Sequence, residues 1–189
     1  MNVILSIDVG IVNIGLCLYE TDESGGRVIH AIRESFAKKR NEIKNDLELT
    51  ATVYKKLICE PFQTLISKAN TVIIERQMKR EMIIIQHVIA IMCMSLGKKV
   101  EFISPQCVKR WFRNAALPGK SHRENKKEAI HVFTNMYPEI LVDGKKKDDI
   151  ADAVLQAAFW CDLQKKKYKK IVLRKKQIKI YNSLRVEKS

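Results

Sequence analysis

Residues 3–19 read Val-Ile-Leu-Ser-Ile-Asp-Val-Gly-Ile-Val-Asn-Ile-Gly-Leu-Cys-Leu-Tyr. The first seven, residues 3–9, are apolar except for Ser6 and Asp8, which predicts a strand buried on both faces. Gly10 turns the chain, and residues 13–19 are predicted to pair back with the first strand as a hairpin. Asp8 therefore lies near the end of a buried strand, where a carboxylate is unfavourable unless something compensates its charge.

The rest of the sequence alternates short β-branched runs with segments of helical periodicity. Further strands are predicted over residues 27–36, 71–75 and 100–103. Helices are predicted over residues 46–69, 80–96, 105–114, 123–136 and 148–164, the first of them kinked or split at Pro61. Antiparallel strands followed by alternating strands and helices predict an α/β fold, with a mixed five-stranded sheet covered by helices on both faces. Residues 1–164 would form this single globular domain.

The composition excludes several classes of protein. The chain has 189 residues, of which 46% are hydrophobic and 30% charged, as in a globular domain and unlike a disordered chain. Its longest apolar stretch, 82–96, is interrupted by polar residues and too short for a membrane span. The N-terminus lacks the features of a signal peptide. Five cysteines without a Cys-x-x-Cys pair predict free thiols in an intracellular, reducing compartment.

The charge is concentrated at the C-terminus. The chain carries a formal net charge of +14, and residues 165–189 contain 11 Lys or Arg against one acid, Glu187. The preceding 164 residues are nearly balanced. This basic C-terminal segment predicts a polyanionic partner, for which a nucleic-acid backbone is the first candidate.

Four acids stand out by their positions. Asp8 and Glu75 each end a buried strand, and Asp149 and Asp152 lie on one face of the first turns of the last helix. Alone, each could be structural, as a turn cap, a strand end in water or a complement to the helix dipole. Together they would repel one another and take up protons unless a divalent cation joined them. Hard oxygen ligands select magnesium or manganese.

These acids resemble the motifs of a known family. Asp8-Val-Gly10 resembles the first motif of the ribonuclease H-like nucleases. The ordered set of Asp8, Glu75 in Val-Ile-Ile-Glu-Arg-Gln, and Asp149-Ile-Ala-Asp152 resembles the RuvC-type Holliday junction resolvases. The stretch Ser104-Pro-Gln-Cys-Val-Lys109, followed by Lys126-Lys127, is similar to the basic motifs of these enzymes. The likeness covers about residues 2–163, and the length and Lys-rich end resemble the poxvirus branch.

The resemblance implies a ribonuclease H-like fold in which the first and fourth strands are neighbours. Asp8, Glu75, Asp149 and Asp152 would then bind two Mg²⁺ ions, which Mn²⁺ could replace, about 4 Å apart. Lys109 would be catalytic, neutralising charge on the transition state, or would only position a phosphate. Asp148 is an alternative third ligand, although the family's Asp-x-x-Asp spacing favours Asp149.

The resemblance also implies partners. The activity would be resolution of four-way DNA junctions by a homodimer, without a small-molecule cofactor, serving viral DNA recombination and concatemer resolution in the host-cell cytoplasm. Helix 80–96 is apolar almost all round, so it is either a core helix or part of a subunit interface. Trp111, Phe112 and Tyr137 either stack on bases or pack in the core. Basic residues in loops and helix starts could contact the DNA backbone: Lys38, Lys39, Arg40, Lys120, Arg123, Lys126 and Lys127.

Two other functions remain open at this point. The chain could be a ribonuclease H-like nuclease for RNA–DNA hybrids or other branched DNA. It could also be a non-catalytic basic DNA-binding module whose acids are structural. A proofreading-type exonuclease is disfavoured, because its Asp-x-Glu motif is replaced here by Asp8-Val9-Gly10.

Overall fold

The structure, a computed structural model, describes residues 2–22, 25–37, 43–112, 122–140 and 147–186. In the last helix the side chains are described as far as Lys166. None of the helices in these ranges is long and apolar enough to cross a membrane.

A mixed five-stranded sheet forms the centre of the molecule, as predicted. Its strands are β1 (Asn2–Asp8), β2 (Asn13–Thr21), β3 (Gly26–Ser35), β4 (Thr71–Glu75) and β5 (Lys99–Ile103), in the order β3-β2-β1-β4-β5. The first three strands pair antiparallel, whereas β1, β4 and β5 run parallel. The hairpin and the neighbouring positions of the first and fourth strands are thereby confirmed.

The central strand β1 supplies side chains to two separate cores. Leu5 and Ile7 pack into the core shared with the helices on one face of the sheet, and Ile4 packs into the core on the other face. All three side chains are fully buried. The unbroken apolar run of β1 follows from this burial on both sides.

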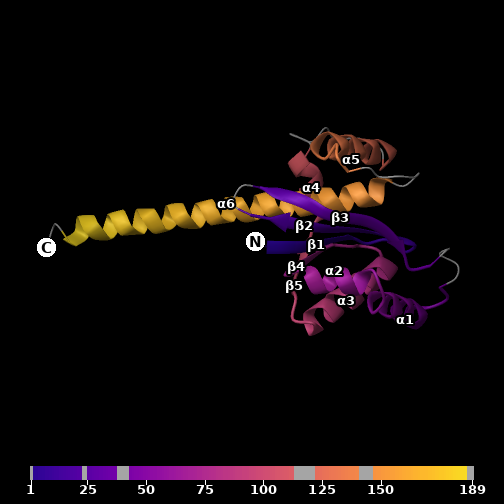
Figure 1. The fold of residues 1–189 in the computed structure, drawn as a ribbon. Coiled ribbons are helices and arrows are strands. Elements are labelled where there is room, and N and C mark those ends of the chain that lie inside the picture. Colours follow the sequence, from indigo (N-terminus) through magenta and orange to yellow (C-terminus); the bar gives the residue numbers. More distant parts are fainter. Residues whose placement is uncertain (1, 23–24, 38–42, 113–121, 141–146, 187–189) are drawn as a thin grey trace.

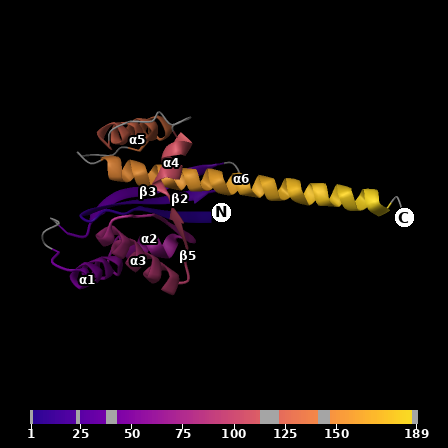
Figure 2. The ribbon, with the colours of Figure 1, turned by 180° about the vertical axis from the view of Figure 1, so that it is seen from behind.

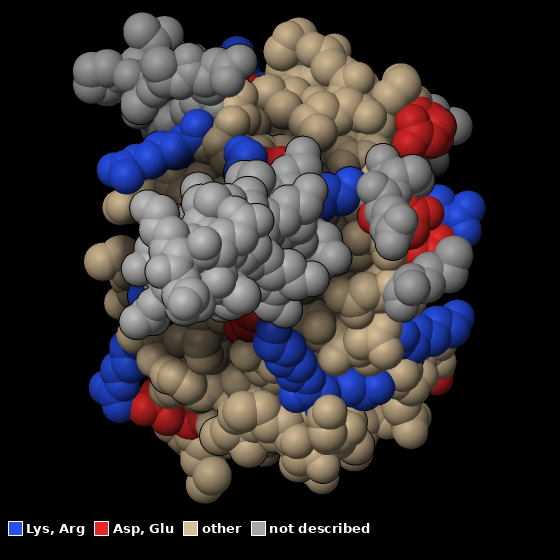
Figure 3. Space-filling model, turned by 90° about the vertical axis from the view of Figure 1, so that its left-hand side faces the viewer, with Lys and Arg blue, Asp and Glu red and all other residues tan. Residues whose placement is uncertain are grey.

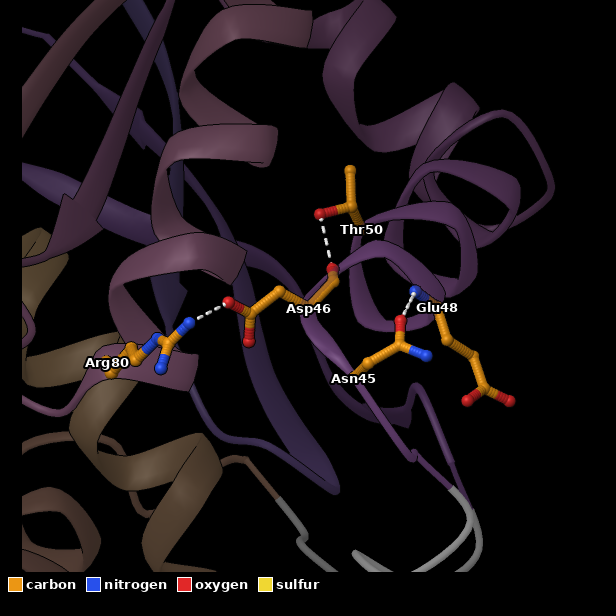
Figure 4. A network of polar contacts seen from close by, with 5 residues as sticks. All are labelled: Asn45, Asp46, Glu48, Thr50 and Arg80. Atoms are coloured by element: carbon orange, nitrogen blue, oxygen red, sulfur yellow. Dashed lines mark hydrogen bonds and ion pairs between the residues drawn. The ribbon is translucent and has the colours of Figure 1, made fainter.

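Three helices cover the first face: α1 (Asp46–Leu57), α2 (Phe62–Lys68) and α3 (Arg80–Ser95) (Figure 1). The predicted helix 46–69 is split into α1 and α2, with a cis peptide bond at Glu60–Pro61 between them. Figure 4 shows how α1 begins. The Asn45 side chain caps the helix by accepting from the Glu48 amide at 2.9 Å, and Asp46 pairs with Arg80 at the start of α3.

Three more helices lie on the second face: α4 (Pro105–Phe112), α5 (His122–Met136) and α6 (Lys147–Val186). The first half of α6 crosses β1, β2 and β3, while α4 and α5 pack against α6 (Figures 1 and 2). This half of α6 is rich in alanine, with Ala151, Ala153 and Ala157 fully buried. Small side chains let the helix lie close to the sheet.

The last helix is much longer than predicted. It continues from Lys147 to Val186, 40 residues or about 60 Å, instead of ending near Gln164. No Gly or Pro follows Gly144, and Lys, Arg and Gln are good helix formers, so nothing in the local sequence ends the helix. Residues 167–186, which contain eight Lys or Arg and no acid, project beyond the sheet and are called the basic arm below (Figures 1 and 2).

The basic arm leaves the domain on the side where β1 begins. Asp8 lies at the opposite end of β1. Figure 3 views the molecule from the side of the arm and shows Lys and Arg side chains around its base. Asp and Glu side chains also lie on this face, so the excess of positive charge is a property of the arm sequence.

Candidate active site

The strands β1 and β4 end side by side, each with an acid. They pair in parallel with Ile7 beside Ile74, so Asp8 and Glu75 are the next residues at the two strand ends. The Glu75 side chain raises the pKa of the Asp8 carboxyl group, so the two carboxyl groups lie close together. A pair this close holds a shared proton or a cation, because two bare negative charges repel strongly.

The first turns of α6 bring two more acids to this sheet edge. Asp152 lines the same pocket as Asp8 and Glu75. The negative charges of Asp152 and Asp149 both act on the Asp8 carboxyl group. The structure therefore brings Asp8, Glu75 and Asp152 to one pocket, and Asp149 lies near enough for its charge to act on Asp8.

Close packing of α6 on β2 sets the position of these first turns. Gly15 of β2 lies opposite Asp8 in the hairpin. A Cβ atom on Gly15 would lie 2.0 Å from the carbonyl oxygen of Asp149 and 3.4 Å from Cβ of Ala153, so only glycine fits. Gly15 was not predicted as a site residue, although a glycine inside a strand is the usual sign of a close backbone approach.

Burial and mutual repulsion dominate the electrostatics of the site. Burial raises the pKa of Asp8 well above its usual range, and the charges of Glu75 and Asp152 raise it further. Burial also raises the pKa of Asp152 to about 7, again with a contribution from Glu75. Lys109 opposes this shift of the Asp152 pKa, so its ammonium group is close enough to act on the carboxylate.

The basic groups at the site come from α4 and α5. Lys109 of α4 lines the pocket together with Pro105, Val108 and Phe112. Lys126 of α5 pairs with Asp148, and this hydrogen bond is the main reason that the pKa of Lys126 is raised. The pocket is thus lined by three acids and one lysine, Lys109.

The two acids Asp148 and Asp149 differ in their surroundings. Asp148 pairs with Lys126, whereas the charge of Asp149 acts on Asp8. The charge of Asp148 also raises the pKa of Asp152, so both acids lie near the cluster and the Asp-x-x-Asp spacing remains the reason for expecting Asp149 as the ligand.

The predicted DNA-contacting residues are only partly described. Lys126 is half-buried at the site and Lys127 is exposed on the same helix. Arg123 belongs to α5, but its side chain lies outside the described part. The remaining predicted contacts lie outside the described residues altogether: Lys38, Lys39, Arg40 and Lys120.

Glutamines that the sequence did not single out also surround the acids. Gln156, one turn after Asp152, is 3% exposed and lines the pocket. Its amide nitrogen lies 3.3 Å from the carbonyl oxygen of Ile7 and 3.4 Å from that of Ile73, which joins α6 to both acid-bearing strands. Gln77 donates to Glu75. Their common signal in the sequence is an amide beside an acid motif.

The chemistry of the donor set fits a hard divalent cation. The four acids supply only oxygen ligands. A positive ion would offset the mutual repulsion and the loss of hydration that raise the pKa of Asp8. Within the described ranges, no three His, Cys, Asp or Glu side chains already form a closed metal-binding group. The acids converge on one another, but they would have to close further around a metal ion.

The remaining predictions concern α3 and the aromatic residues. Ile85 and Ile89 of α3 are fully buried, whereas Ile91 and Met94 on its outer face are 63% and 54% exposed. This helix thus contributes to the core and also presents an apolar outer surface. Tyr137 is buried and its hydroxyl lies 3.0 Å from that of Tyr19, which favours the core-packing interpretation.

The chain is similar to known proteins in both sequence and structure. The family described as poxvirus A22 protein matches residues 2–165. The search of curated proteins gave no match. Among solved structures, the resolvase of fowlpox virus in complex with a substrate Holliday junction aligns at 20% identity and a TM-score of 0.61, covering 86% of this chain and 98% of that one.

Two further structures align in the same way. The fowlpox virus Holliday junction resolvase alone gives 19% identity and a TM-score of 0.60, covering 86% of this chain and 99% of that one. RuvC of Thermus thermophilus gives 16% identity and a TM-score of 0.55, covering 86% and 96%. At these identities the likeness shows a shared fold, which is ribonuclease H-like and of the RuvC type. The basic arm lies beyond the family match.

Proposed function

The chain belongs to the poxvirus A22 protein family, and from this membership we propose that it is a structure-selective DNA endonuclease. Its substrate would be the four-way DNA junction, which it would resolve by paired, metal-dependent hydrolysis of two phosphodiester bonds. The fowlpox virus protein of the same fold is itself called a Holliday junction resolvase, and one of its structures contains a substrate junction. In a poxvirus this activity would serve recombination and concatemer resolution in the host-cell cytoplasm.

The observation that carries the proposal is the convergence of four acids at one sheet edge. A partly buried cluster of like charges lowers the stability of the fold unless a cation neutralises it. The charges of Glu75, Asp149 and Asp152 all act on the Asp8 carboxyl group. A nuclease accounts for this arrangement, because phosphodiester hydrolysis needs cations held next to the substrate.

We propose that Asp8, Glu75, Asp149 and Asp152 hold two Mg²⁺ ions, with Mn²⁺ able to substitute. When bound, such ions polarise the scissile phosphate and lower the pKa of the attacking water. The reaction consumes one water molecule for each cut and leaves a 5′-phosphate and a 3′-hydroxyl. The acids Asp8, Glu75 and Asp152 line the pocket together with the apolar side chains of Val108 and Phe112.

We propose that Lys109 contacts the scissile phosphate directly, and not through a metal ion. It lines the pocket, and its positive charge already acts on Asp152. An ammonium group at this place would stabilise the negative charge that builds up on the phosphate oxygens in the transition state. Lys126, held by Asp148, would contribute a second positive charge nearby.

We further propose that the enzyme acts as a homodimer through the outer face of α3. Near the C-terminal end of α3, Ile91, Met94 and Leu96 are each more than half exposed. Ile84 and Val88, nearer its N-terminal end, are partly exposed. An exposed apolar patch of this kind is typical of an interface. A two-fold dimer would carry two active sites, as paired cuts across a junction require.

Cleavage assays on a set of substrates test this function. Purified protein would be incubated with a four-way junction, linear duplex, a flap and an RNA–DNA hybrid, with Mg²⁺ or with EDTA. The proposal expects symmetrical cuts in the junction with Mg²⁺ only, and little cutting of duplex. Preferred cutting of the hybrid would indicate the alternative nuclease, and metal-independent binding without cutting would indicate a non-catalytic DNA-binding module.

A further inference from the structure

We propose that Gln77 and Gln86 are positioning residues for Glu75, and that together they form a hydrogen-bond relay from helix α3 to the carboxylate. The relay would hold Glu75 ready for the divalent cations, so this inference rests on the proposed function. Gln77 is the last residue of the stretch Val-Ile-Ile-Glu-Arg-Gln that carries Glu75, whereas Gln86 lies outside the acid and lysine motifs of the sequence.

The relay begins at a buried amide on an apolar helix. Gln86 is 6% exposed, and it is the one polar side chain among the five residues that α3 buries. Its neighbours in this buried set include Ile85 and Ile89. An amide is unfavourable in such surroundings unless it is hydrogen-bonded. Its side-chain oxygen accepts from the backbone N–H of Gln77 at 2.8 Å.

The second step of the relay reaches the active site. The side-chain nitrogen of Gln77 donates to Oε2 of Glu75. Gln77 lies in the connection between β4 and α3, whose backbone is also fixed to β5 by a 2.8 Å bond from the Arg76 N–H to the carbonyl oxygen of Ile103. Gln86 and β5 thus hold the backbone on which the Gln77 side chain is mounted.

The relay addresses a specific problem of Glu75. Glu75 is the last residue of β4 and only half-buried, so its side chain could turn towards solvent. Repulsion from the nearby Asp8 and Asp152 carboxylates favours that movement. A hydrogen bond from Gln77 to the ionised carboxylate opposes it, because bonds to charged acceptors are strong. The relay therefore keeps Oε2 of Glu75 in place.

Residues that orient metal ligands have a measurable signature. Removing such a partner lowers metal affinity or activity by about 10- to 100-fold. Gln77→Met and Gln86→Met keep the length of the side chain while removing the amide, which limits any effect on packing. Gln63→Met on the outside of α2 is the matched control, because Gln63 is exposed and on an element that does not carry the site.

The first measurement is the affinity of the full-length variants for Mn²⁺ in the absence of DNA, determined by titration calorimetry. Gln77→Met and Gln86→Met should each weaken Mn²⁺ binding by about 10-fold or more, with Tm and junction affinity in EDTA close to wild type. The double variant should be no worse than the single ones, because both changes interrupt one relay. Wild-type Mn²⁺ affinity in Gln77→Met would overturn the proposal.

A second measurement does not depend on metal or activity. Hydrogen exchange of the Gln77 backbone amide should be slow in wild type and in Gln63→Met, and should become at least 10-fold faster in Gln86→Met. An amide that exchanges equally fast in all three proteins would overturn the relay. A wild-type protein that binds no Mn²⁺ and cuts no junction would instead overturn the proposed function, and the exchange data would still decide the relay.

Discussion

Replacing Gly15 by alanine tests whether close contact between β2 and α6 positions the acids. The new Cβ atom would lie 2.0 Å from the carbonyl oxygen of Asp149 and 2.7 Å from its carbonyl carbon. Ordinary carbon–oxygen contacts are about 3.3 Å or longer, so the first turn of α6 must move by more than about 1 Å. A misplacement of this size at reacting groups costs on the order of 100-fold in rate. The strain should lower the free energy of unfolding by about 1–3 kcal/mol.

The assay compares Gly15→Ala with Gly25→Ala, a control position where an added Cβ atom meets no other atom within 4 Å. Single-turnover cleavage of a four-way junction and thermal unfolding would be measured for both. Gly15→Ala should cut about 100-fold more slowly while still binding the junction, and Gly25→Ala should match wild type. Equal rates and equal stability for the two variants would show that α6 is not held at Gly15.

Three further predictions follow from burial and charge. Among the cysteines, the exposed Cys59 and Cys107 should react quickly with a thiol reagent at pH 8, whereas the buried Cys93 and Cys161 should react only when the protein unfolds. Burial raises the pKa of the Cys93 and Cys161 thiols to about 11, which leaves little reactive thiolate at pH 8. Equal reaction rates for the four thiols in a colorimetric assay would contradict this prediction. Ile91→Glu on the exposed face of α3 should convert a dimer to a folded monomer, as measured by sedimentation. This monomer should nick a four-way junction but resolve it poorly in a cleavage assay. An unchanged dimer would place the interface elsewhere. Five cations of the basic arm can be neutralised together: Lys169, Lys170, Arg174, Lys175 and Lys176. This change should reduce the magnitude of the slope of log K against log salt for duplex binding by up to about 4.5. An unchanged slope would exclude DNA contacts by these residues.

Most of the fold could be predicted from the sequence because local and long-range signals agree. The apolar run of β1, the short β-branched β4 and the break at Pro61 each define an element by its own residues. The extent of α6 could not be predicted in the same way. Its apolar pattern ends near Gln164, yet the following Lys- and Arg-rich sequence continues the helix because no breaker follows.

The acids of the candidate site were predictable because a carboxylate in a buried strand conflicts with its surroundings. Asp8 and Glu75 could be placed together as soon as β1 and β4 were taken as parallel neighbours. Gly15, Gln77 and Gln86 could not be found in this way. The role of Gly15 depends on the contact of β2 with the distant helix α6. The roles of Gln77 and Gln86 depend on the course of the β4–α3 connection, which places the Gln77 amide groups between Glu75 and Gln86 and is not encoded by a residue pattern.

The structure also changes which variants test the dimer. The sequence alone would place a test charge at the centre of the apolar helix 80–96, as in Ile85→Glu or Ile89→Glu. Both side chains are fully buried against the sheet, so these changes should unfold the domain instead of separating two subunits. Ile91 is the informative position, because it is 63% exposed on the outer face.

The most direct test of the central claim is single-turnover cleavage of a four-way junction by Asp8→Asn, with Asp148→Asn measured beside it. Asp8 receives the charges of the other three acids, whereas Asp148 is paired with Lys126. Asp8→Asn should lose essentially all cleavage in Mg²⁺ while binding the junction as wild type does, and Asp148→Asn should retain much of its activity. Cleavage near the wild-type rate by Asp8→Asn would contradict the assignment of this sheet edge as the active site.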